Sequence, residues 1–332
     1  MRNILCVTLI ALLGGCTSTS VTEKYQDKRN DIINVKDKVI EFETGNVLIG
    51  SVSRLYMSNK CLLIADHKSV DKQIHIFNKN DFSYLTSIGT FGEGPEEITV
   101  MGCLAIDEAH HQLYVSDHAK QKIFSYDMDS VMVDSLYKPQ VKTAMNETLF
   151  PSEYQYINDT LSIAVLIKPT STSTFNQFLG RWNMNTGEMI PMKYTHPDIQ
   201  KKRITFAASE KAGIYVECYT RHDLMTICSL DGELLYNIYG PDWDGGNGNK
   251  LQSFGTVMIG NDKIFVSYCG EDYARDSFPT KILVFDLEGN YLKTLETGYK
   301  ISDCCYDSFN NRIILSLNDV VQFAYLDIDG II

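Results

Sequence analysis

The chain has 332 residues, 44% of them hydrophobic, and a formal net charge of −12 at pH 7. This length exceeds the usual size of a single core, unless the domain is built from repeats or is a large all-β fold. The acidic balance and the lack of a polybasic run exclude nucleic acid and anionic lipid as main partners. Nineteen Tyr and fifteen Phe residues favour strands over helices.

The first residues have the pattern of an export signal. Arg2 precedes a short apolar run at 4–13, which is too short to span a membrane. It ends in Leu13-Gly14-Gly15-Cys16, which resembles a bacterial lipobox, although an ordinary signal peptide with a chance Cys is the alternative. We therefore predict a signal peptide at 1–15 and a lipidated Cys16, which would anchor the chain to the bacterial outer membrane on its periplasmic face. Residues 16–37 are polar and predict a flexible tether.

Seven cysteines remain when Cys6 and Cys16 are set aside, an odd number that cannot pair completely. Most lie in apolar strand patterns, where a free Cys behaves as a small hydrophobic residue. A bridge between Cys218 and Cys228 is not expected, because the turn at 219–222 would place Cys218 opposite about Asp223. No Cys-x-x-Cys occurs, so a structural zinc site has no support.

A small polar turn recurs six times along the chain, at an average spacing of about 50 residues. Asp, Asn and Gly suit such turns, because they tolerate positive φ angles and their side chains bond to nearby backbone. Periods of about 40–50 residues with four strands each are typical of β-propeller blades. The turns lie at 77–81, 126–130, 183–188, 229–233, 286–290 and 327–330.

The fold predicted from this repeat is an all-β, six-bladed propeller at 38–332 with four strands in each blade. The last blade lacks its outer strand, and residues 39–42 are expected to supply it and close the ring. The predicted strands are 51–57, 61–65, 73–77 and 83–88; 100–106, 112–116, 122–126 and 132–137; 152–157, 161–167, 175–182 and 188–193; 203–208, 213–218, 224–229 and 234–239; 253–259, 263–268, 281–285 and 291–295; and 300–306, 312–316 and 320–326.

One stretch resembles a known family. Gly89-Thr90-Phe91-Gly92-Glu93-Gly94-Pro95-Glu96-Glu97, followed by Leu104-Ala105-Ile106-Asp107 and Leu113-Tyr114-Val115-Ser116-Asp117, is similar to the NHL/TolB-like six-bladed propellers, especially bacterial lipoproteins. The resemblance implies that ligands bind over the central channel, on the face with the loops between second and third strands and between blades. Second strands of the third and fourth blades lack the terminal Asp found in the first two, at Asp66 and Asp117.

Two Asp-His pairs, Asp66-His67 and Asp117-His118, fall on that implied face. The two imidazoles and nearby carboxylates could hold a divalent metal. The alternative is that both Asp residues bond nearby backbone N–H groups and that both His residues are ordinary exposed loop residues. No cofactor is expected apart from such a metal.

The remaining candidates for a ligand-binding face come from four loops. Trp243 lies in a Gly-rich loop, where it could stack on a sugar or peptide, or fold back and cap its own blade. The other members of the predicted face are Phe91, Glu93, Arg221, His222, Glu271, Tyr273 and Arg275.

No Gly-x-Ser-x-Gly, His-Glu-x-x-His or triad-like pattern occurs, so a catalytic role has little support. We predict a monomeric cell-envelope lipoprotein that binds a glycan, peptide or protein partner without catalysis. The alternative is a metal-dependent hydrolase or lyase with its site at the mouth of the channel.

Overall fold

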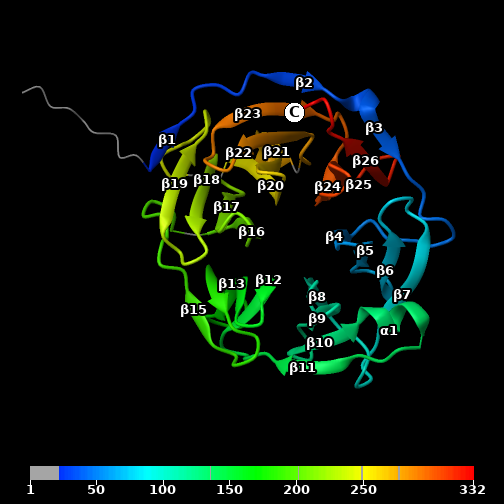
Figure 1. Cartoon of the computed structure of the whole chain (residues 1–332). Coiled ribbons are helices and arrows are strands. Elements are labelled where there is room, and N and C mark those ends of the chain that lie inside the picture. The colour runs from blue at the N-terminus through cyan, green and yellow to red at the C-terminus, as the bar shows by residue number, and fades with distance from the viewer. Residues whose placement is uncertain (1–21, 135, 201, 248–249, 276) are drawn as a thin grey trace, which may run out of the picture.

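The computed structural model describes residues 22–134, 136–200, 202–247, 250–275 and 277–332. Its strands form six sheets arranged around a central axis (Figure 1), which confirms the six-bladed propeller. The predicted signal peptide and Cys16 lie outside the described residues. Among the helices that are described, none is long and apolar enough to cross a membrane.

The strands that each blade contributes in sequence run antiparallel, and the first of them lies nearest the axis (Figure 1). Blades one to three hold β4 (Ser53–Met57), β5 (Cys61–Asp66), β6 (Lys72–Asn78) and β7 (Tyr84–Thr90); β8 (Met101–Asp107), β9 (Gln112–Asp117), β10 (Lys122–Asp127) and β11 (Gln140–Ala144); and β12 (Phe150–Asn158), β13 (Leu161–Pro169), β14 (Phe175–Trp182) and β15 (Met189–Pro191).

Blades four to six continue the same order around the ring. They hold β16 (Ile204–Ser209), β17 (Ile214–Tyr219), β18 (Leu224–Ser229) and β19 (Leu234–Tyr239); β20 (Leu251–Gly260), β21 (Lys263–Asp272), β22 (Lys281–Asp286) and β23 (Tyr291–Glu296); and β24 (Ile301–Asp307), β25 (Arg312–Leu317) and β26 (Phe323–Asp327). The two 3-10 turns are η1 (Lys36–Lys38) and η2 (Tyr273–Arg275).

The last blade is completed by β3 (Val39–Glu41), which pairs antiparallel with β26. This confirms the predicted ring closure by 39–42. Phe42 follows the strand and stacks on Phe82 of blade one, with ring centroids 3.9 Å apart. The closing segment therefore joins the last blade to the first through both backbone pairing and aromatic packing.

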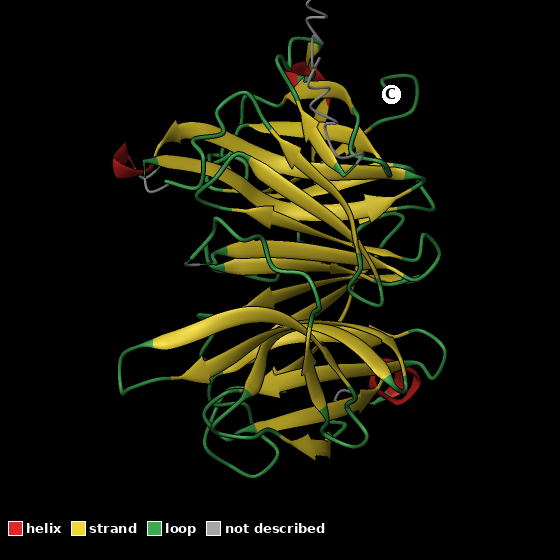
Figure 2. Ribbon diagram, turned by 90° about the vertical axis from the view of Figure 1, so that its left-hand side faces the viewer, coloured by secondary structure: helices red, strands yellow, loops and turns green. Residues whose placement is uncertain are grey.

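Figure 2 shows the blades from the side of the ring. The cores lie between neighbouring blades, where apolar side chains of adjacent sheets pack together. Middle strands such as β5 and β25 are buried along their whole length, because sheets pack on both of their faces. All seven described cysteines are buried and unpaired, and Cys218 faces Met225 in the register. The prediction of no Cys218–Cys228 bridge is thus confirmed.

The predicted outer strand of blade two at 132–137 is wrong. Residues 128–133 form a short helix, α1 (Met128–Val133), and the outer strand is β11, further along the chain. The side chain of Asp127 accepts a hydrogen bond from the Ser130 backbone N–H and caps this helix. A polar turn with the same composition as the others therefore starts a helix here instead of a tight hairpin.

The predicted flexible tether at 16–37 is also wrong for its described part. β1 (Glu23–Tyr25) adds to the outer edge of blade four beside β19, and β2 (Ile32–Asn34) adds to blade five beside β23. Both strands run parallel to their neighbours. The open edges of these sheets offer unpaired backbone groups, which the polar segment satisfies.

We call the face where second and third strands are joined the upper face. The lower face carries the polar turns that join third and fourth strands. First strands run from the upper to the lower face, and fourth strands run back from the lower to the upper face.

Candidate functional site

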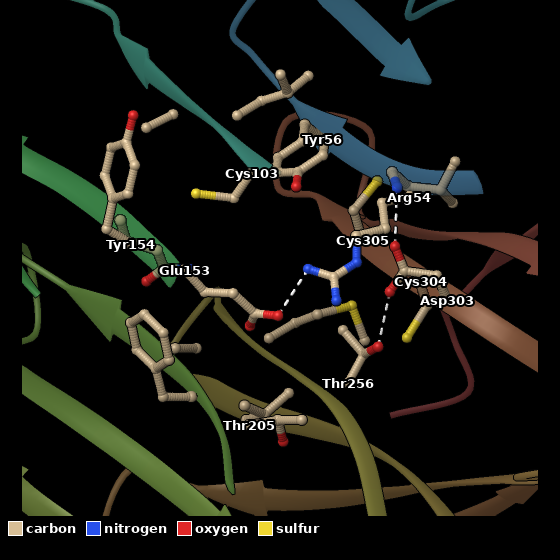
Figure 3. A pocket seen from close by; sticks show the side chains of 18 of the residues that line it. Arg54, Tyr56, Cys103, Glu153, Tyr154, Thr205, Thr256, Asp303, Cys304 and Cys305 are labelled. Carbon is tan, nitrogen blue, oxygen red and sulfur yellow. Dashed lines mark hydrogen bonds and ion pairs between the residues drawn. The ribbon is translucent and has the colours of Figure 1, made fainter. Parts of the chain in front are cut away.

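The first strands of all six blades line a central channel with a volume of about 1130 Å³. Alternate side chains of such a strand point into the channel, and the others pack between sheets. Most of the side chains that line it are small or apolar, but three carry a charge: Arg54, Glu153 and Asp303. These three lie close together in the channel (Figure 3).

Arg54 and Glu153 form an ion pair that links β4 of blade one to β12 of blade three. The Nη1 atom of Arg54 lies 2.8 Å from Oε1 of Glu153. The side chains are 46% and 38% exposed, and this exposure is to the channel they line. Burial is the largest single effect and disfavours the charged guanidinium, but Glu153, Tyr56 and Asp303 together raise the pKa of Arg54 above its usual value.

Asp303 joins blade six to its two neighbours. One carboxylate oxygen accepts a hydrogen bond of 2.8 Å from the Leu55 backbone N–H, and the other accepts one of 2.7 Å from the Thr256 hydroxyl (Figure 3). Burial raises the pKa of Asp303, although these hydrogen bonds act in the opposite direction. The side chain therefore has a structural role as well as a position in the channel.

Blades three, four and five are tied together by two further bonds near the axis. The Thr205 hydroxyl donates to the Gly255 carbonyl at 2.6 Å, and Gln155 Oε1 accepts from the Ala208 N–H at 2.5 Å. Together with the contacts of Arg54 and Asp303, these two bonds connect most of the blades around the channel.

His67 and His118 line the channel close to its upper mouth. Burial lowers the pKa of both imidazoles, so both rings are held in the neutral form. The Nε2 atom of each ring is buried without a hydrogen bond of normal geometry among the described residues, although the Met101 backbone is close enough to His67 to act on its pKa. A Cβ atom on Gly102 would lie 2.4 Å from Nε2 of His118, so a glycine in β8 makes room for this ring.

The prediction that Asp66 and Asp117 bond to backbone is confirmed by their contacts. Asp66 accepts hydrogen bonds from Gly50 and Lys68 N–H groups. Asp117 accepts four such bonds, from the N–H groups of Thr99, Val100, Ala119 and Lys120. Both side chains are 3% exposed or less, and their oxygens are committed to holding the loops.

A metal site at His67 and His118 therefore gains no support from neighbouring carboxylates. In the part of the chain that the structure describes, one set of three metal-ligating side chains has its ligand atoms within 4.8 Å of one another, and it consists of Asp107, His110 and Asp159. That set lies on the lower face. His110 Nδ1 is already 2.8 Å from Asp107 Oδ2, in an ordinary imidazole–carboxylate contact.

Four predicted face residues form two pairs between blades four and five. The guanidinium of Arg221 lies 3.0 Å from the ring centroid of Tyr273, which is a cation–π contact. Arg275 forms an exposed ion pair of 3.1 Å with Glu271 in the same loop. The structure brings these residues of the predicted face together, but their charged groups mainly interact with one another.

His222 and Trp243 are packed into blade four. Trp243 lies against Tyr239 and His196, with ring centroids 4.9 and 5.7 Å apart, and so caps its own blade. This is the second of the two roles expected from the sequence. His222 is only 8% exposed, and its ring centroid lies 5.9 Å from that of Trp243.

Phe91 and Glu93 are exposed, but they lie in the loop after β7, across the ring from blades four and five (Figure 1). The loop is fixed by Lys120, whose ammonium donates to the Gly94 and Glu97 carbonyls at 2.5 and 2.6 Å. The predicted face therefore divides into two separate patches.

The charged residues of the channel were not anticipated from the sequence. Each lies in the first strand of a blade, directly before a buried residue: Arg54 before Leu55, Glu153 before Tyr154, and Asp303 before Cys304. A charge in a first strand was the available signal, because the first strand of a propeller blade lines the channel.

The comparisons with known proteins agree with the fold. A family described as a 6-bladed beta-propeller, DUF5128, matches residues 17–176. Among curated proteins, none matches this chain.

Three solved structures are similar in shape. A Bacteroides fragilis protein named as a candidate exported protein is 14% identical, with a TM-score of 0.56, over 89% of this chain and 87% of its own. A Bacteroides vulgatus member of the DUF4221 family is 11% identical, with a TM-score of 0.59, over 90% and 98%. A luciferin-regenerating enzyme is 8% identical, with a TM-score of 0.56, over 86% and 94%. At these identities the likeness shows the fold alone.

Proposed function

We propose that this protein is an NHL/TolB-like lipoprotein of the bacterial cell envelope that binds a glycan, peptide or protein partner without catalysis. Cys16 carries the lipid, and the propeller is held on the periplasmic face of the outer membrane. The lipobox pattern at 13–16 supports the anchor, and the similarity to a Bacteroides protein named for export is consistent with it.

The observation that carries the binding role is the half-exposed ion pair within the central channel. Arg54 and Glu153 present 46% and 38% of their side-chain surface on the wall of a channel of about 1130 Å³. Ligand pockets in proteins combine mostly apolar walls with a few polar groups, and this channel has that character. His67 and His118 lie on the same wall, but their Nε2 atoms are buried away from the open space.

The charges of the channel restrict the ligand. Arg54 is already paired with Glu153, and Asp303 adds a second carboxylate. The imidazoles are neutral, so no unpaired positive charge awaits an anion. A neutral or cationic polar group, such as a sugar hydroxyl or a peptide amine, fits this wall better than a phosphate or carboxylate does.

The test uses the solubilised full chain and defined panels of neutral glycans and peptides. The channel variant is Arg54→Met/Glu153→Gln, which removes both charges together and leaves no unpaired partner. Its control is Arg181→Met/Asp231→Asn, which removes an exposed pair on the outside of blades three and four. We expect a panel ligand to lose at least about tenfold in affinity with the channel variant and nothing with the control.

Equal affinities for the wild type and the channel variant would overturn the assignment of the channel as the binding site. Unchanged melting temperatures in both variants would show that the loss is one of binding rather than of folding.

A further inference from the structure

The described N-terminal residues form a belt around the outside of the ring. This N-terminal belt, residues 22–41, follows the outer edges of blades four, five and six in turn (Figure 1, blue). It adds a fifth strand to the first two of these blades and the fourth strand to the last. The belt fixes the position at which the described chain begins, beside blade four.

The start of the belt is fixed by specific side-chain contacts to blade four. The carboxylate of Glu23 accepts hydrogen bonds from Asn237 at 3.1 Å and from the Tyr239 hydroxyl at 2.5 Å. Tyr25 stacks on Tyr239, with ring centroids 4.5 Å apart. These contacts come in addition to the backbone pairing of β1 with β19.

A buried arginine then locks the belt between blades four and five. Arg29 is 7% exposed, and its Nη1 lies 2.7 Å from Oδ1 of the fully buried Asp223. The guanidinium also lies within 6 Å of the ring centroids of Phe254, Tyr268 and Phe285. Detaching the belt would leave Asp223 buried without its partner, so the belt belongs to the folded domain.

The direction of β1 shows from which side the chain arrives. β1 is parallel to β19, which begins just after the lower-face turn at Asp231 and Gly232. The chain therefore approaches Glu23 from the lower-face side of blade four. His67 and His118 line the channel at the opposite, upper face.

The distance from Cys16 to the belt is short. Glu23 is seven positions after Cys16, and a fully extended chain over seven positions reaches about 25 Å. A compact domain of this size is about 50 Å across. Because Glu23 is held on blade four, an anchor at Cys16 keeps that blade within about 25 Å of the bilayer, whereas blade one, across the ring, is under no such restraint (Figure 1).

We infer that the lower rim of blade four is the surface that faces the membrane, and that the upper mouth of the channel opens away from it. This inference rests on the lipid anchor of the proposed function. Asp231, Glu233 and Glu288 are partly or fully exposed around the attachment point, so the rim has no excess of positive charge to attract anionic lipid. The acyl chains alone hold the domain, and membrane binding does not depend on salt.

The orientation is tested with the full-length lipidated protein in phosphatidylcholine vesicles that carry a nitroxide quencher on the lipid headgroup. The described native cysteines are all buried, so a fluorophore reacts selectively with one introduced surface Cys. The label positions are Asp231→Cys on the lower rim of blade four, Asn80→Cys on the lower face of blade one and Val70→Cys on the upper face of blade one. All three residues are exposed.

We expect quenching at least about threefold stronger for Asp231→Cys than for Val70→Cys, with Asn80→Cys also weak. Insertion of twenty Gly/Ser residues after Ser20 lengthens the tether and should reduce this difference. Equal quenching at the three positions, or stronger quenching at Val70, would overturn the orientation while leaving the anchor intact. If wild-type protein and Cys16→Ser both fail to float with vesicles, the proposed anchor itself is wrong.

Discussion

Arg54 and Glu153 meet across the central channel, with Nη1 of one 2.8 Å from Oε1 of the other, although they belong to blades one and three. Blade two lies between these blades in the ring and contributes no charge to the channel wall. The pair therefore bridges blades that do not adjoin each other, and it places a polar contact within the channel.

Replacing one member of this pair should have a small effect on stability. Because both side chains are partly exposed to the channel, Arg54→Met is expected to cost about 1 kcal/mol or less in the free energy of unfolding. Adding Glu153→Gln should recover part of that cost, since no unpaired carboxylate then remains. Urea denaturation measures both values, and a loss above about 3 kcal/mol would contradict the solvent-accessible character of the pair.

Arg29→Met should be far more damaging, because it leaves Asp223 buried without a cation. The expected loss is about 3–5 kcal/mol in the free energy of unfolding, and Arg29→Met/Asp223→Asn should recover much of it. Arg181→Met, at an exposed pair, is the matched control and should cost less than about 1 kcal/mol. Similar losses for the two arginine variants would show that the N-terminal belt adds little stability.

Ring closure can be tested at Phe42. This side chain is 9% exposed and stacks on Phe82 and Phe323, so Phe42→Ala should cost about 3 kcal/mol or more. Deletion of residues 38–43, which removes β3 as well, should lower the melting temperature further. A deletion variant with the full melting temperature would refute closure by this segment.

The buried imidazoles predict a pH dependence of stability. The pKa values of His67 and His118 are lowered from 6.5 by burial, so the unfolded chain binds protons more readily than the folded protein does. Their contribution to stability is therefore full above pH 6.5 and declines as the pH falls through 6.5 towards the folded pKa values. Arg54 and Asp66 act on His67 in opposite directions, and Asp117 partly offsets the effect at His118.

A His67→Gln/His118→Gln variant isolates that contribution. Between pH 7 and 5 its stability should fall less steeply than that of the wild type, as measured by urea denaturation at each pH. Asp303, whose raised pKa acts with the opposite sign, is unchanged in both proteins and cancels from the comparison. Parallel pH profiles would contradict the neutral state of the two imidazoles.

Metal content distinguishes the binding role from the alternative of a metal-dependent enzyme. The carboxylate oxygens of Asp66 and Asp117 accept hydrogen bonds from backbone N–H groups. We therefore expect substoichiometric metal in protein purified without chelator, and the same metal content in the His67→Ala/His118→Ala variant. Elemental analysis by mass spectrometry measures this. Stoichiometric zinc or calcium that disappears in the double variant would restore the hydrolase or lyase hypothesis.

The sequence by itself determined the blade count, the order of the strands and the closing segment at 39–42. Those features depend on local signals: alternating apolar positions, and Asp, Asn and Gly in turns that repeat about every 50 residues. Local signals failed where one polar turn began a helix at Asp127, and where residues 23–34 found open sheet edges that no pattern in their own sequence reveals.

Only the tertiary structure decided which side chains share a site. Arg54 and Glu153, or Arg29 and Asp223, lie far apart in the chain, and they meet because the sheets close into a ring. The same closure separated the loop after β7, which holds Phe91, from the loop between β17 and β18, which holds Arg221, although both loops are on the upper face. The packing of Trp243 on Tyr239, four positions earlier, is by contrast a contact within one stretch of the chain. Contacts across an axis depend on the positions of all six blades, whereas a turn depends on only a few neighbouring residues.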